Sequence, residues 1–302
     1  MSARPQAVVG QSPEALATGV SSEPFAPAVV VPLRPAPGAQ QVRSRRGVPR
    51  GPALSTLTVA TLIAVWAIVS WFEWIPALYL PGPEAVVAKL VEVATTGYMD
   101  ATLWQHLGAS LARVAVALVA AVLLAVPVGL AIGLSPAARA VLDPLIEFYR
   151  PVPPLAYLPL IVIWFGIGEF SKVLLIFLAV FAPIVVATAA GVHKVDPVRV
   201  RVTQSLGGSR WQVIRHVVLP SALPDILTGL RIGLGTGWST LVAAELIAAT
   251  QGLGFMIQSA SQFLVTDLVV AGILVIAVVA FILDAVLRRL QRRLAPWEGQ
   301  TH

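Results

Sequence analysis

The residue types that most often perform metal or phosphate chemistry are scattered through this sequence. Its four histidines show no HExxH-like spacing, and no cysteine accompanies them. None of its lysines follows a glycine, as the phosphate-binding P-loop requires. The sequence therefore predicts no metal site, no catalytic residue and no ATP site of its own. A membrane enzyme needs clustered nucleophile, base or metal ligands, so enzymes are the least favoured class.

Two charged residues lie inside an otherwise apolar stretch, at Arg231 and Glu245. They are too far apart to pair on one helix, because 14 positions correspond to about 21 Å. Either they pair with other helices or extend to the interface, or they line a gate or transport pathway. Arg113 begins another apolar stretch, and we expect it at the outer membrane interface.

The other pathway or gate candidates are prolines and aromatic residues: Pro153, Pro154, Tyr157, Trp164 and Trp238. The aromatic residues could equally serve as interfacial belts or packing. The prolines crowd the start of their segment, where they remove helix donors and restrict the preceding residues. We expect irregular backbone at 150–154 and a short helix from about residue 155. Such backbone either lines a cavity at membrane depth or lies in the headgroup layer.

The composition indicates which elements hold these residues. Hydrophobic residues make up 57% and charged residues 12% of the 302-residue chain, about half the charged content of a soluble domain. Apolar segments at 54–72, 114–134, 150–169, 173–192, 226–247 and 267–284 predict an all-α membrane protein with six transmembrane helices. Gly229, Gly233 and Gly237 form a small-residue stripe that predicts close helix packing.

The basic residues predict the orientation. With a cytosolic amino terminus, nearly all arginines fall inside and only Lys89 and Lys172 lie in outer loops. The net charge of +6 therefore follows topology, and no nucleic-acid partner is predicted. We divide the chain into a disordered Pro/Ala-rich extension (1–52), a first transmembrane helix with its outer loop (53–105), a transmembrane domain (106–291) and a cytosolic tail (292–302).

The inner loop at 194–224 is the most informative segment. It predicts two short helices separated by Gly207-Gly208, the second capped by Ser209, carrying an apolar stripe and ended by Leu219-Pro220. By composition alone, it could also be a membrane-surface helix anchored by arginines.

This loop resembles that of ATP-binding-cassette importer permeases, whose pattern is EAA, three residues, Gly, nine residues, Ile, one residue and Leu-Pro. Gly207 and Leu219-Pro220 keep the spacing, Val217 replaces Ile, and Arg201-Val202-Thr203 departs from EAA. Segments 144–172, 219–256 and 292–299 are similar to permeases of the taurine, sulfonate and nitrate branch, most of all those for taurine.

The resemblance implies a type I importer permease fold in a bacterial inner membrane, surrounded by lipid. It implies taurine or a related sulfonate as substrate, with alkanesulfonates or nitrate as alternatives. An ion-coupled secondary transporter is a distant alternative, because the internal repeats common in that class are not seen in this sequence. The resemblance also implies two copies of an ATPase that binds ATP, a periplasmic substrate-binding protein and a second copy of the chain. The residues expected to couple to the ATPase are Ser205, Leu206, Gly207, Gly208, Ser209, Arg210, Leu219 and Pro220.

Overall fold

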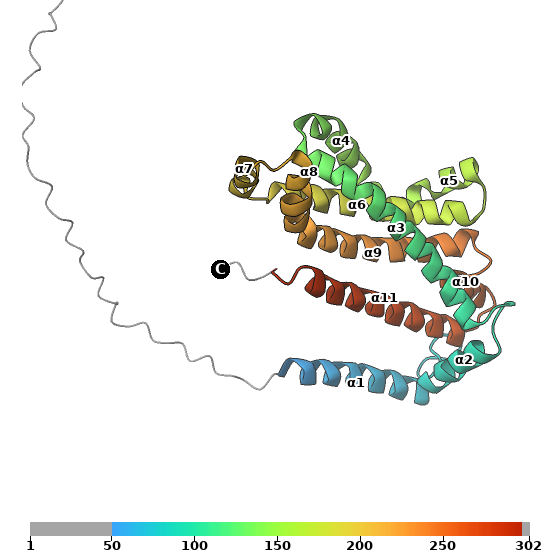
Figure 1. Cartoon of the computed structure of the whole chain (residues 1–302). Helices are drawn as coiled ribbons and strands as arrows, with labels where there is room; N and C mark the ends of the chain where they lie inside the picture. The colour runs from blue at the N-terminus through green and yellow to red at the C-terminus, as the bar shows by residue number, and fades with distance from the viewer. Residues whose placement is uncertain (1–49, 298–302) are drawn as a thin grey trace, which may run out of the picture. The chain divides into compact units, whose positions relative to one another are not determined.

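The computed structural model describes residues 50–297, and these are helical almost throughout, with no β-strand among them. The described residues from Pro52 onward form one compact unit. The helices are α1 (Arg50–Trp71), α2 (Pro83–Thr95), α3 (Leu103–Leu134), α4 (Pro136–Tyr149), the 3₁₀ turn η1 (Pro154–Tyr157), α5 (Leu158–Phe165), α6 (Glu169–His193), α7 (Pro197–Ser205), α8 (Arg210–Val213), the π turn η2 (Ile214–Val218), α9 (Leu219–Ala248), α10 (Leu253–Gln262) and α11 (Thr266–Leu294) (Figure 1).

The predicted membrane class is confirmed. Within the described residues, five helices are long and apolar enough to cross a bilayer, and α4 with η1–α5 makes a sixth if the bent pair counts as one span. The second span starts at Leu103, before the predicted Val114, because its first turns carry polar residues that lower the hydropathy. The predicted extension at 1–52 lies almost wholly outside the described residues. The boundaries proposed at 105/106 and 291/292 fall inside α3 and α11.

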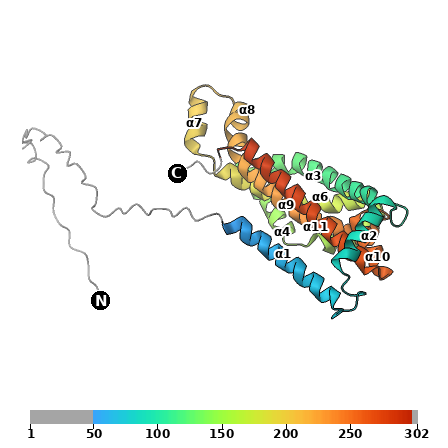
Figure 2. The same ribbon diagram turned by 90° about the horizontal axis from the view of Figure 1, so that it is seen from below.

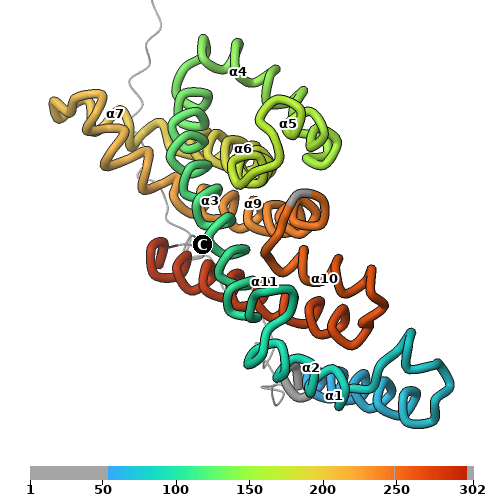
Figure 3. Tube along the Cα trace, turned by 90° about the vertical axis from the view of Figure 1, so that its right-hand side faces the viewer, coloured from blue at the N-terminus to red at the C-terminus, as the bar shows by residue number. Residues whose placement is uncertain are grey.

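The irregular backbone predicted at 150–154 is found, but the predicted segment forms only the second half of a bent pair whose first helix, α4, starts at Pro136. The α4 helix ends at Tyr149, residues 150–153 form a turn, and η1 and α5 continue at 88° to α4. Regular α-helix resumes only at Leu158 and ends where Gly166 adopts φ +78°. The pair curves past α6 (Figure 3).

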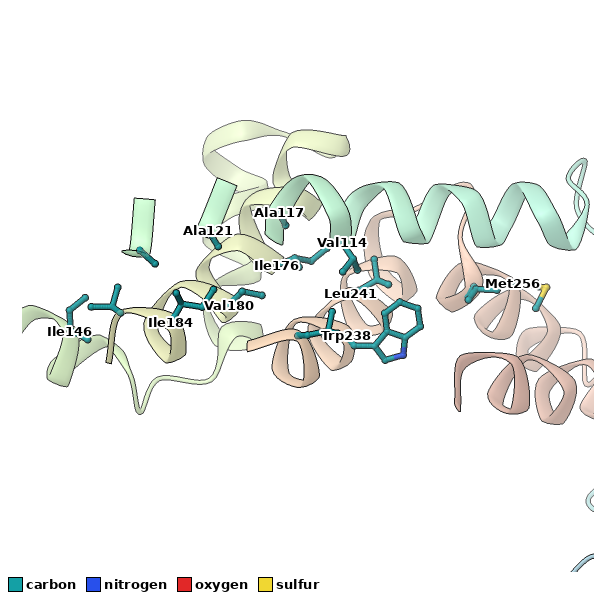
Figure 4. Packing of buried hydrophobic residues seen from close by; sticks show 14 of the residues in the cluster. Val114, Ala117, Ala121, Ile146, Ile176, Val180, Ile184, Trp238, Leu241 and Met256 are labelled. Carbon is teal, nitrogen blue, oxygen red and sulfur yellow. The ribbon is translucent and has the colours of Figure 1, made fainter. Parts of the chain in front are cut away.

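The centre of the unit is the packing of α6 against α3 on one side and α9 on the other. Alanines of α3 meet Ile176, Val180 and Ile184 of α6, and Leu241 of α9 closes the same cluster (Figure 4). The glycine stripe of α9 faces α6 of the same chain: a Cβ added at Gly233 would lie 3.0 Å from Val180 Cγ1. Close helix approach, predicted from that stripe, is confirmed.

The loops divide between two ends of the bundle. The start of α1, the end of α11 and the elbow formed by α7 and α8 lie at one end, while α2 and α10 lie at the other (Figures 1 and 2). Arg199, Arg201, Arg210 and Arg215 are all on the elbow and exposed. These exposed arginines therefore gather at one end of the bundle, which agrees with the positive-inside rule.

Candidate functional site

The elbow lies between α6 and α9, and the first half of this elbow has the structure that the sequence predicts. Gly207 ends α7 in the left-handed region at φ +84°, and the Gly208 N–H donates to Thr203 O at 3.0 Å. Ser209 then caps α8 in a reciprocal pair: its Oγ accepts from the Gln212 N–H, and Gln212 Oε1 accepts from the Ser209 N–H. The turn is thus held by backbone geometry and two caps.

The prediction that Leu219-Pro220 ends the second helix is wrong. The helix continues from Arg210 to Ile247. It can do so because the π turn at 214–218 replaces the usual i→i−4 hydrogen bonds by i→i−5 bonds just before the proline. There the Leu219 N–H donates to Ile214 O, five residues back. Pro220 therefore sits in the first turn of α9, where its missing donor costs little.

The outer surface of the elbow is apolar at two points. Leu206 is 84% exposed and Trp211 66% exposed, while the inner side packs Val213 and Val218 against Val192 of α6. Lys194 pairs with Asp225 at 2.5 Å and ties the end of α6 to α9. The elbow is anchored to two central helices and presents large apolar side chains outward.

A cavity of about 440 Å³ lies where the bent third span meets α6 and α9. The bend supplies Tyr149, Arg150, Pro153, Pro154 and Tyr157, among others. The α9 side supplies three hydroxyls, from Thr236, Ser239 and Thr240, next to Gly235. Of its lining residues, all in the described part of the chain, Arg150 alone carries a charge.

A buried ion network closes the opposite end of the bundle from the elbow. Glu245 of α9 is fully buried and accepts from Arg113 Nη1 at 2.6 Å, Ser110 Oγ at 2.8 Å and the Gly254 N–H at 2.9 Å. Arg113 makes two further bonds to Glu169 at 2.6 and 2.8 Å, and Lys172 reaches the same carboxylate at 2.8 Å. Two cations thus face two anions, which is how buried charges are tolerated.

The same network fixes the turn between α9 and α10. Arg113 Nη1 also donates to Gln251 O at 2.8 Å, and Ser110 Oγ accepts from the Leu253 N–H at 2.9 Å. Gly252, at φ +137°, leaves no room for a Cβ because the Glu245 carboxylate occupies that space. The α3, α6, α9 and α10 helices therefore meet at one charged cluster.

Comparison with known proteins identifies the class. Residues 121–296 match the family described as "Binding-protein-dependent transport system inner membrane component". The taurine transport system permease of Escherichia coli K12 is 61% identical over 86% of this chain and 95% of its own length. The putative aliphatic sulfonates transport permease of Bacillus subtilis 168 is 37% identical over 88% and 95%. The nitrate import permease of Synechocystis is 32% identical over 80% and 89%.

The chain belongs to this family. It is an inner-membrane transport component and not an enzyme. A solved structure titled as inward-facing conformations of the MetNI methionine ABC transporter superposes with a TM-score of 0.54 at 18% identity, covering 64% of this chain and 95% of that one. The predicted type I importer permease fold is confirmed.

The structure divides the permease's predicted pathway residues into two sets. Pro153, Pro154 and Tyr157 line the cavity. Trp164 is 65% exposed on α5, whereas Trp238 is buried in the central core. Neither tryptophan lines the cavity.

The two charges that the sequence places inside the fifth apolar segment, Arg231 and Glu245, both pair with other helices. Glu245 pairs with Arg113, and Arg231 pairs with Asp284 of α11. Arg113 is buried against these helices, with 5% exposure, at the end of the bundle opposite the elbow; its expected position at the outer membrane interface stays a prediction. Interhelical pairing, one of the two interpretations from sequence, describes both residues in this conformation.

Sequence reasoning missed several residues of both sites. Thr236, Ser239 and Thr240 follow i, i+3, i+4 spacing, which marks one helical face and could have been found. Tyr149 and Ser110 carry no comparable signal, because their roles depend on which helices the fold brings together.

Proposed function

We propose that the permease is the membrane subunit of an ATP-driven importer of taurine or a related small sulfonate. The observation that supports this proposal is that sequence identity differs among the relatives whose names state a substrate. Identity to the taurine permease is 61%, against 37% to an aliphatic sulfonate permease and 32% to a nitrate permease. Alkanesulfonates and nitrate are the alternatives that an experiment must separate.

Uptake by the reconstituted transporter tests this proposal. Proteoliposomes containing the permease, its ATPase and its binding protein should take up taurine with ATP inside, and more slowly ethanesulfonate and nitrate. Preference for nitrate would contradict the assignment of substrate. Uptake driven by an ion gradient, without any ATPase, would contradict the whole class in favour of a secondary transporter.

The elbow is the proposed contact with the ATPase, which binds the ATP. Its exposed Leu206 and Trp211 are large apolar side chains on a capped turn, and such side chains dominate protein interfaces. Leu206→Glu should therefore abolish co-purification of the ATPase, while Leu264→Glu, at a leucine 67% exposed at the other end, should not. Retained ATPase binding by Leu206→Glu would exclude this surface.

We place the elbow and the amino terminus in the cytosol. The support is the gathering of exposed arginines at the elbow end of the bundle. An Arg210→Cys thiol, the only one in this cysteine-free chain, should react with impermeant reagents only from the inner side. Reaction only from outside intact cells would reverse the topology and remove the elbow from the ATPase.

A second copy of the chain is proposed to complete the pathway. Gly235, Thr236 and Ser239 form an exposed face on α9 that carries two hydroxyl groups. In membrane proteins, small and hydroxyl-bearing residues are enriched where one helix packs against another. By contrast, no residue of α1 from Leu54 to Trp71 is buried, its exposed large side chains are all apolar, and its exposed Thr58 and Thr61 donate to carbonyls one turn back in the same helix, which suits lipid. Two permeases per complex, counted by native mass spectrometry, are expected; a single copy would refute the dimer.

A further inference from the structure

The cavity beside the bend has two chemically different walls. On α9, the hydroxyl protons of Ser239 and Thr240 go to backbone carbonyls one turn back, at 3.2 and 2.8 Å, and Thr236 Oγ1 donates to Gly233 O at 2.9 Å. With their protons committed, these oxygens can only accept from a guest molecule. The α9 wall is therefore an acceptor wall.

The bend supplies donors instead. Tyr149 donates its proton to Leu178 O, so it cannot also donate to Tyr157, whose hydroxyl lies 3.3 Å away. The Tyr157 proton is thus available either to the Tyr149 oxygen or to a guest. Arg150, half-exposed at the same bend, has its nearest carboxylate, Glu147, only at 4.0 Å. The bend wall therefore offers a hydroxyl donor and a guanidinium.

We propose that this cavity is the permease's own binding site for a short zwitterion with a sulfonate at one end and an amine at the other. The anion contacts Arg150 and Tyr157, and the ammonium contacts the hydroxyl oxygens of Thr236, Ser239 and Thr240. Prolines and Leu155 and Leu178 supply apolar lining for the two-carbon linker. This inference rests on the proposed function, because it assumes that a sulfonate passes through the chain.

The position of the cavity agrees with a place on the route of the transported substrate. Gly235, Thr236 and Ser239 are exposed on this chain, so the cavity opens onto the face proposed to meet the second copy. The walls come from the bend and from α9, the helix that carries the elbow. Arg150 contributes a charge whose ion pair with Glu147 is long, at 4.0 Å, and exposed. Such a charge suits a carrier site, which must release its cargo as well as bind it.

A thiol placed on the acceptor wall tests the site directly. The natural chain has no cysteine, so Ser239→Cys is a unique label site, and Ser261→Cys on α10 is the matched exposed control. Full-length protein in lipid nanodiscs is treated with 2-sulfonatoethyl methanethiosulfonate or with its trimethylammonioethyl counterpart. The first reagent leaves a two-carbon sulfonate on the sulfur, which copies the proposed guest with sulfur in place of the amine.

The expected result is an anion-to-cation rate ratio about tenfold higher at position 239 than at position 261, a factor typical of one charge-assisted contact. Tyr157→Phe and Arg150→Gln should each lower that ratio at 239 and leave 261 unchanged. Taurine should slow labelling at 239 more than ethanesulfonate, which lacks the amine. Equal ratios at the two positions, or ratios unaffected by Tyr157→Phe, would overturn the site.

The outcome is separable from that of the proposed function. If taurine uptake is found but position 239 shows no anion preference, sulfonate import stands and this cavity is not the site. If position 239 prefers the anion but the reconstituted complex carries no sulfonate, the cavity binds anions and the proposed function is wrong.

Discussion

Removal of the Glu245 carboxylate should destabilise the permease more than any other single charge deletion discussed above. Glu245→Ala leaves Arg113 with only Glu169 as its carboxylate partner, and it orphans the Gly254 N–H and one bond from Ser110. Breaking a buried ion pair costs about 3–5 kcal/mol. The surviving Glu169 contact, whose side chain is 62% exposed, moves the expectation to the lower half of that range.

The assay is thermal unfolding of the detergent-purified permease, followed by tryptophan fluorescence. At about 2–4 °C per kcal/mol for a domain of this size, the loss corresponds to a drop in Tm of about 6–15 °C. Glu84→Ala, which removes an exposed carboxylate on α2, should shift Tm by no more than about 2 °C. Glu245→Gln should fall between the two, because it preserves volume and one acceptor.

A double-mutant cycle decides whether the pair itself is responsible. Arg113→Gln alone leaves Glu245 and Glu169 without their shared cation, so it should also be severe. Combining it with Glu245→Gln should cost less than the sum of the two by about 1–3 kcal/mol, as expected for residues in direct contact. Additive effects, or a Glu245→Ala variant as stable as Glu84→Ala, would refute the reasoning.

Three further outcomes follow from the helix contacts. Gly229→Ala should lower the free energy of unfolding by about 1–3 kcal/mol, because the new Cβ would collide with the Ala187 Cβ and lie 3.1 Å from Pro183 O. Gly235→Ala, with nothing within 4 Å, should raise or preserve the free energy of unfolding, and equal thermal shifts of the two variants would contradict this. Ser209→Ala should weaken ATPase binding to the permease, because loss of the helix cap costs about 1 kcal/mol. Ser209→Asp should preserve binding, since Asp also caps a helix, and a pull-down titration measures the difference. Asp284→Asn should shift Tm by no more than about 3 °C, because its pair with Arg231 is partly exposed and such pairs contribute little; a shift as large as that of Glu245→Ala would show that the pair is buried by lipid or partner.

Much of this architecture is predictable because each signal is local. Six apolar segments identify the spans, Gly207 and Ser209 identify the turn of the elbow, and the four-residue glycine spacing identifies a close helix contact. Clustered prolines also predict the break in the third span. In every case the residues that carry the signal adjoin the feature that they produce.

The features that could not be predicted depend on contacts or backbone geometry for which the sequence carries no local signal. Pro220 is compatible with a continuous helix only because a π turn precedes it, and the sequence gives no clear sign of that turn. The sequence also gives no sign that Arg113 is buried in an ion network, because its partners Glu169 and Glu245 lie 56 and 132 positions away. The cavity likewise combines Tyr149 with α9 hydroxyls almost ninety positions away, so only the fold assembles it.

The continuity of α8, η2 and α9 has a mechanical consequence. One helical run from Arg210 to Ile247, 38 residues and about 57 Å long, carries the elbow at its start, and the cavity's acceptor wall and then Glu245 in its last third. A displacement of the elbow by a partner is therefore applied to the cavity wall through a single rod. That rod is held at its far end by Arg113, Ser110 and the Gly254 N–H, so movement at the elbow end pivots on the ion network. The π turn is the point at which such a rod bends most easily, because its hydrogen-bond ladder is already widened there. A helix broken at Pro220, as the sequence first suggests, would not transmit force in this way.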